Sequence, residues 1–191
     1  MKLTSFLLTS LVAGAGFMAT GAGAQTIERT AALDISDDGV GGFNAYFGDT
    51  FAASTQDSTF SDLFTFSVDT PFDAAGSLTS SYLNVQQTKD LDITSFSLYR
   101  YDPATMNVLG TAIAGIDESG AGPNPTDVWS LSGFGLAQGD YALRIDGQVS
   151  GAGGGAFGGD LNISPVPEPQ TWAMLLGGLG LAGMLARRRK P

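Results

Sequence analysis

The chain has 191 residues, including 27 glycines, and it contains neither cysteine nor histidine. The missing residues exclude disulfides, thiol chemistry, serine–histidine triads and the commonest zinc ligand. Nine basic and nineteen acidic residues give a net charge of −10, which argues against nucleic acid and anionic lipid as partners.

The N-terminus has the composition of a secretory signal peptide. Lys2 precedes an apolar stretch rich in small residues, and Ala22-Gly23-Ala24 is a small-x-small cleavage site. We expect cleavage between Ala24 and Gln25, so that residues 1–24 are removed on export.

The expected mature domain is more acidic than the precursor. Its basic residues are Arg29, Lys89, Arg100 and Arg144, and all nineteen acidic residues lie between Glu28 and Glu168, so its net charge is 4 − 19 = −15. This charge favours solubility, cation binding or coexistence with a hydrated extracellular matrix.

Three carboxylates follow the new N-terminus in a short loop that ends at a glycine: Asp34, Asp37 and Asp38. Oxygen ligands on a flexible loop suit Ca²⁺, although the spacing does not match an EF-hand. A set of ordinary acidic turns is the alternative, so Ca²⁺ is a possible ligand and no other cofactor is expected.

A Phe-x-Asp-x-Phe motif occurs at Phe60, Asp62 and Phe64, and residues 47–51 repeat it. We expect the phenylalanines at 60–64 to anchor the start of a core strand. Asp62 shares their parity, which predicts either a strand edge or a paired side chain. In the motif we expect this aspartate to cap a turn or to accept a hydrogen bond from a neighbouring backbone amide. Contact with a ligand is the alternative role.

Residues 25–164 are expected to form one all-β domain. Period-two alternation and turn residues predict strands, strong at 60–68, 91–99 and 141–149 and weaker at 77–85, 107–116, 128–134 and 158–163. The run at 91–99 contains one slip that indicates a bulge. The glycine-rich residues 150–159 predict a loop. The pattern is typical of an antiparallel β-sandwich or jelly-roll-like domain.

Catalysis finds little support in the sequence. There is no Gly-x-Ser-x-Gly motif, and the three glutamates lie near the N-terminus, in a glycine-rich loop and in the tail. A pair of aspartates could still act in glycoside hydrolysis, but nothing singles one out. Trp129 could belong to a sugar-binding platform or to the core. We therefore expect a protein that is not an enzyme.

The C-terminus is organised in three parts. Residues 165–170 are a proline-rich stalk containing Pro167, Glu168 and Pro169, and residues 171–190 are an apolar run followed by a basic stop that includes Arg187, Arg188 and Arg189. A helix over 171–186 is roughly 24 Å long, which suits a transmembrane helix once flanking side chains reach the interfaces. The basic end should remain cytoplasmic.

This tail is similar to the PEP-CTERM signal of bacterial exosortase substrates, and together with Phe60, Asp62 and Phe64 the chain resembles the FxDxF family of PEP-CTERM proteins. The resemblance implies exosortase as the processing partner at Pro167-Glu168-Pro169. It also implies a precursor anchored in the inner membrane and a mature protein at the cell surface or in the extracellular matrix of an exopolysaccharide-producing bacterium. The expected function is a non-enzymatic structural or biofilm role, and a carbohydrate- or calcium-binding matrix module is the alternative.

Overall fold

The computed structural model describes residues 25–39, 41–83, 89–120, 126–166, 174–179 and 181–183. The signal peptide up to Ala24, the sorting residues Pro167, Glu168 and Pro169, and the basic stop at Arg187, Arg188 and Arg189 lie outside these residues. Those predictions therefore stay predictions.

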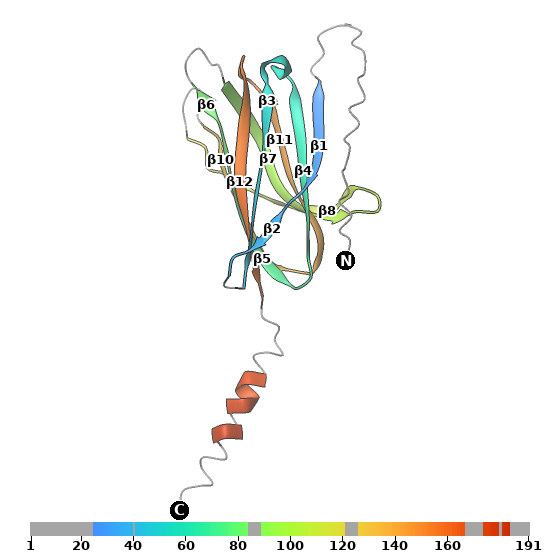
Figure 1. The fold of residues 1–191 in the computed structure, drawn as a ribbon, viewed down its shortest axis with the longest axis vertical. Coiled ribbons are helices and arrows are strands. Elements are labelled where there is room, and N and C mark those ends of the chain that lie inside the picture. Colours follow the sequence, from blue (N-terminus) through green and yellow to red (C-terminus); the bar gives the residue numbers. More distant parts are fainter. Residues whose placement is uncertain are drawn as a thin grey trace, which may run out of the picture.

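The described domain consists of two six-stranded sheets that face each other (Figure 1). The first sheet has the order β1-β4-β11-β7-β6, with β8 also paired to β7. Its strands are β1 (Thr26–Ala32), β4 (Thr59–Val68), β6 (Tyr82–Leu83), β7 (Lys89–Asp102), β8 (Asn107–Ala114) and β11 (Gly139–Val149).

The second sheet has the order β2-β3-β12-β5-β10-β9. Its strands are β2 (Ile35–Asp37), β3 (Phe43–Ala52), β5 (Phe72–Ser80), β9 (Ile116–Asp117), β10 (Val128–Leu136) and β12 (Gly154–Pro165). A short 3₁₀ helix, η1 (Ala53–Thr55), lies between β3 and β4 in the chain.

The core fills the space between the two sheets. Alternate residues of the central strands point inward, as the pleat of a strand requires. Phe60 of β4, Leu143 of β11 and Leu161 of β12 are almost fully buried, and phenylalanine rings from both sheets meet in the same cluster. The structure thus confirms an all-β, sandwich-like domain.

The strongly alternating segments form the predicted strands. Residues 60–68 lie in β4 and residues 141–149 in β11, each with apolar side chains turned inward. The predicted bulge in 91–99 is also present, because Asp146 and Gly147 of β11 pair with Ser95 and Ile93 and leave Thr94 without a register partner.

The prediction lacks the three N-terminal strands β1, β2 and β3. β1 exposes most of its side chains, so it lacks the alternation that marks a half-buried strand. β3 has buried residues at alternate positions, but Asp49 interrupts its apolar pattern. β1 also pairs with β4 in parallel, whereas the predicted sandwich or jelly-roll-like domain was antiparallel.

The predicted glycine-rich loop at 150–159 is wrong in its second half, because β12 begins at Gly154. The glycines are needed there for close packing. An added Cβ at Gly155 would lie 2.6 Å from the Leu91 side chain, and one at Gly159 would lie 2.2 Å from the Ser77 carbonyl oxygen. Glycine in this strand therefore marks contact with neighbouring chain segments.

The described parts of the C-terminal tail are helical at residues 174–179 and 181–183, and their side chains are exposed. They include the apolar Met174, Leu176 and Leu181. Within the described residues, no helix has the length and apolar character needed to cross a membrane. The transmembrane helix predicted at 171–190 therefore stays a prediction.

Candidate functional site

The two Phe-x-Asp-x-Phe segments face each other across the sandwich. One lies in β3 and the other in β4, which belong to different sheets. The ring centroids of Phe51 and Phe60 are 4.4 Å apart, and those of Phe47 and Phe64 are 5.5 Å apart. Because the phenylalanines pair in reverse order, the central aspartates of the two segments are brought together.

Asp62 is buried in the middle of β4, between β1 and β11, with 1% of its surface exposed. As a carboxylate it accepts no hydrogen bond, but when protonated its carboxyl bonds to that of Asp49. Asp62 is therefore not at a strand edge, and it neither caps a turn nor accepts a hydrogen bond from a backbone amide. The alternative prediction, a paired side chain, agrees with its interaction with Asp49 and with the nearby Arg29. A buried carboxyl group that accepts no hydrogen bond is costly when ionised.

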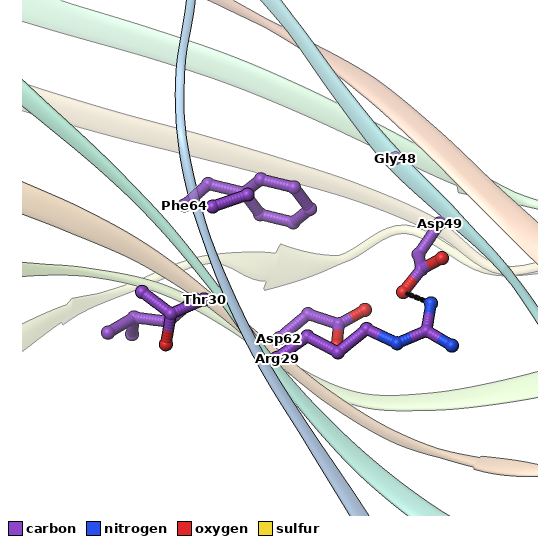
Figure 2. Close-up of a pocket in the computed structure, with 8 residues that line it drawn as sticks. Arg29, Thr30, Gly48, Asp49, Asp62 and Phe64 are labelled. Carbon is purple, nitrogen blue, oxygen red and sulfur yellow. Dashed lines mark hydrogen bonds and ion pairs between the residues drawn. The ribbon is translucent and has the colours of Figure 1, made fainter. Parts of the chain in front are cut away.

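Arg29 closes this site from the edge strand. It is the register partner of Asp62 in the β1–β4 pair, and its guanidinium forms an ion pair with Asp49 of β3 (Figure 2). The guanidinium carbon also lies 5.4 Å from the centroid of the Phe51 ring. One side chain of the first sheet thus reaches across to the second sheet at the open edge of the sandwich.

Burial is the main reason that the pKa of Asp62 rises from its usual 3.8 to about 7. The negative charge of neighbouring Asp49 and a hydrogen bond between the two carboxyl groups add to this rise. Arg29 lowers the pKa, and Asp146 raises it by less. Asp62 therefore takes up a proton near neutral pH, although aspartates are ordinarily ionised there.

A groove of about 420 Å³ lies over this group and is lined by Arg29, Thr30, Gly48, Asp49, Asp62 and Phe64, among others (Figure 2). Asp49 and Arg29 are partly exposed, with 17% and 46% of their side chains accessible. Solvent thus reaches the ion pair, while the oxygens of Asp62 are sealed beneath it. The arrangement can hold or release a proton at Asp62, but it presents no free carboxylate to a substrate.

The three predicted calcium ligands lie around β2: Asp34 precedes the strand, Asp37 ends it and Asp38 follows it. Asp37 accepts a hydrogen bond from the Gly39 amide at 2.6 Å, and Asp38 accepts one from the Gly42 amide at 2.8 Å. Asp34 is exposed before β2. Among the described residues, no group of three or more acidic side chains is arranged to hold a metal ion, so the predicted Ca²⁺ site gains no support.

Four further carboxylates lie at another place, which no motif in the sequence marks. Asp90, Asp92, Asp117 and Asp127 line a pocket of about 400 Å³ beside the ends of β7, β9 and β10. Burial and the charge of Asp127 raise the pKa of Asp90. Burial also raises the pKa of Asp127, although its carboxylate accepts a bond from the Ile93 amide at 2.9 Å. This bond gives Asp127 a structural role.

Trp129 of β10 is half-buried and packs against the hydrophobic core. Its indole nitrogen has no hydrogen-bond partner. The position favours the core role over an exposed sugar-binding platform.

The sequence drew attention to Phe60, Asp62 and Phe64 but not to Arg29 or to the role of the second motif copy. Two signals were present. The motif is repeated, and Arg29 is one of only four basic residues in the expected mature domain. Neither signal reveals that β1 returns to lie beside β4, which is what brings Arg29 to Asp62.

The start of the sorting tail is held by the domain. β12 runs to Pro165, one residue past the predicted domain end, and Pro165 pairs with Phe72 of β5. The Val166 amide then donates to the Pro71 carbonyl at 2.8 Å. The predicted processing residues therefore begin immediately after the last residue anchored to the sandwich.

Two solved structures are similar over most of the chain, but only weakly. PliG of Aeromonas hydrophila, a periplasmic inhibitor of g-type lysozyme, is 12% identical with a TM-score of 0.32, covering 73% of this chain and 97% of PliG. The pre-peptidase C-terminal domain of a Bacillus anthracis collagenase is 12% identical with a TM-score of 0.28, covering 76% and 98%. Neither likeness is close enough to support a functional argument. No curated protein matches the chain.

A family comparison agrees with the organisation of the C-terminus. The model of the PEP-CTERM protein-sorting motif matches residues 165–190, which include the stalk, the apolar run and the basic residues. Within the sandwich, the match covers only Pro165, the last residue of β12. Residues 165–190 are thus a PEP-CTERM protein-sorting motif, the signal of an exported protein that exosortase processes.

Proposed function

We propose that this protein is a non-enzymatic component of the cell surface or extracellular matrix, delivered by cleavage at its sorting motif. The observation that carries the proposal is the join between the sandwich and the motif. The domain holds the chain up to Val166, and the PEP-CTERM match begins at residue 165. A cut near Pro167-Glu168-Pro169 would release the whole domain and leave the apolar run behind.

The domain itself supports a structural role rather than a catalytic one. The opposed carboxylates of Asp49 and Asp62 are covered by Arg29, and the oxygens of Asp62 are closed to solvent. A glycosidase of the two-carboxylate type needs both groups at the substrate. The net charge of −15 expected for the mature domain suits a hydrated polysaccharide environment, in which it prevents self-association.

The Phe-x-Asp-x-Phe motif also fits this proposal. Its two copies build one end of the core, which accounts for the motif by folding and needs no ligand. We therefore assign the chain to the FxDxF group of PEP-CTERM proteins as part of the proposal. In this assignment Phe60, Asp62 and Phe64 specify the domain, and the tail specifies its destination.

Mass spectrometry of the protein from an exosortase-containing host tests the delivery step. We expect a mature N-terminus at Gln25, a C-terminus near residues 165–170, and the protein in the matrix fraction. Glu168→Ala should keep the tail attached and the protein in the membrane fraction. Glu118→Ala, which removes the same charge from a loop of the domain, should be processed normally. A wild-type C-terminus still at Pro191 would overturn the proposal.

A further inference from the structure

The edge strand β1 is weakly anchored compared with the strands it covers. Six of its seven residues are exposed, and only Ile27 packs against the core. It pairs on one side only, with β4. The Arg29–Asp49 ion pair is its side-chain link to the second sheet. Edge strands with few buried contacts open at lower free energy than the rest of a domain.

β1 covers Asp62, the buried carboxyl group that, among the described residues, accepts no hydrogen bond as a carboxylate. Asp62 lies beside Arg29 in the β1–β4 register, and both of its oxygens are sealed from water. Opening of β1 removes that seal and lets water solvate the carboxylate. The open form therefore accepts an ionised Asp62 far more readily than the closed form does.

We propose that β1 is a proton-controlled strap: it stays closed while Asp62 carries a proton and is released as Asp62 ionises. The charged side chains that set the pH of this transition lie on the strands around Asp62. Asp49 on β3 and Asp146 on β11 oppose ionisation, whereas Arg29 on β1 favours it. Arg144 of β11 forms an ion pair with Asp146 at 2.9 Å and so weakens the repulsion between Asp146 and an ionised Asp62.

The direction of the switch follows from comparing the closed and open forms. In the closed form the pKa of Asp62 is about 7, against 3.8 for a solvated aspartate. Between these two values the closed form holds a proton that the open form lacks, so each rise in pH favours opening. The effect levels off above pH 8, where Asp62 is ionised in both forms. Opening exposes the edge of β4. It also displaces Arg29, the residue of β1 that forms an ion pair with Asp49.

Hydrogen–deuterium exchange tests the strap on the protein purified from the exporting host. Two amides report on β1: that of Leu33, which donates to the Thr65 carbonyl at 2.8 Å, and that of Thr59, which donates to the Gln25 carbonyl at 3.1 Å. After correction for intrinsic exchange, we expect their opening to increase at least about tenfold between pH 5 and pH 8. The Ser81 amide, bonded to the Ala156 carbonyl of β12, should change far less.

Variants identify the group responsible. Asp62→Asn should reduce the change at Leu33 and Thr59 to less than about twofold, because asparagine does not titrate. Asp49→Asn should move the transition to lower pH, because it removes the strongest repulsive charge and frees Arg29 to face Asp62. Asp69→Asn, which removes an exposed charge in a loop, should behave as wild type. An unchanged pH dependence in Asp62→Asn, or an equal change at Ser81, would overturn the strap.

Discussion

Replacing Asp62 by asparagine should abolish a loss of stability that the wild-type domain undergoes as the pH rises from 4 to 8. Asparagine has nearly the same shape as aspartate and carries no charge at any pH. Asp62 lies beneath the Arg29–Asp49 ion pair, and as a carboxylate it accepts no hydrogen bond, so the wild-type protein must ionise a sealed carboxyl group above neutral pH.

The magnitude follows from the two pKa values. The pKa of Asp62 is about 7 in the folded domain and 3.8 when the group is solvated. The two pKa values differ by about 3, and each pKa unit is worth roughly 1.4 kcal/mol. The free energy of unfolding should therefore change by about 4 kcal/mol as Asp62 ionises. Because the folded pKa is the higher one, this stabilisation is fully present below pH 4, is lost as the pH rises towards 7, and is absent above pH 8.

Urea unfolding of wild type and Asp62→Asn at a series of pH values measures this difference directly. Asp90 and Asp127 also have raised pKa values, but they are present in both proteins, so their contribution cancels. The asparagine amide introduces a constant offset that does not depend on pH. The free energies of unfolding should therefore diverge by up to about 4 kcal/mol in favour of the variant between pH 4 and pH 8. Parallel pH profiles for the two proteins would refute the reasoning.

Two further substitutions probe the packing of the sheets. Gly159→Ala should destabilise the domain by about 2 kcal/mol in thermal unfolding, because the added Cβ would lie 2.2 Å from the Ser77 carbonyl oxygen. Gly120→Ala is the control and should have little effect, because no atom lies within 4 Å of the added Cβ. Arg100→Ala should cost about 1 kcal/mol, because its guanidinium lies 5.1 Å from the Tyr141 ring centroid; a variant as stable as wild type in urea would show that this contact contributes nothing.

The sequence predicted the parts of the fold in which local pattern and burial coincide. β4 and β11 alternate cleanly because one face of each lies in the core, and β7 shows its bulge as a slip in that alternation. β1 could not be found in this way, because nearly all of its side chains face water. Its position depends on pairing with β4, a contact about 33 residues away that no local pattern encodes.

The candidate site, like the fold, could be predicted only in part. The motif at Phe60, Asp62 and Phe64 was visible as a motif, but its aspartate was assigned an ordinary hydrogen-bonding role. Its actual surroundings come from three other strands, which supply Asp49, Arg29 and Asp146. The sorting signal could be read in full because its information is contained in consecutive residues, as the match over 165–190 shows.

The position of β12 governs when this domain can fold during export. β12 is the last strand in the chain, yet it lies inside the second sheet, between β3 and β5. A chain that emerges from its N-terminus therefore has no complete second sheet until residues 154–165 have crossed. Non-local pairing of this kind forms slowly and leaves strand edges unpaired meanwhile. In the proposed delivery, a membrane stop just beyond the final strand would hold the newly crossed chain at the membrane while its second sheet closes.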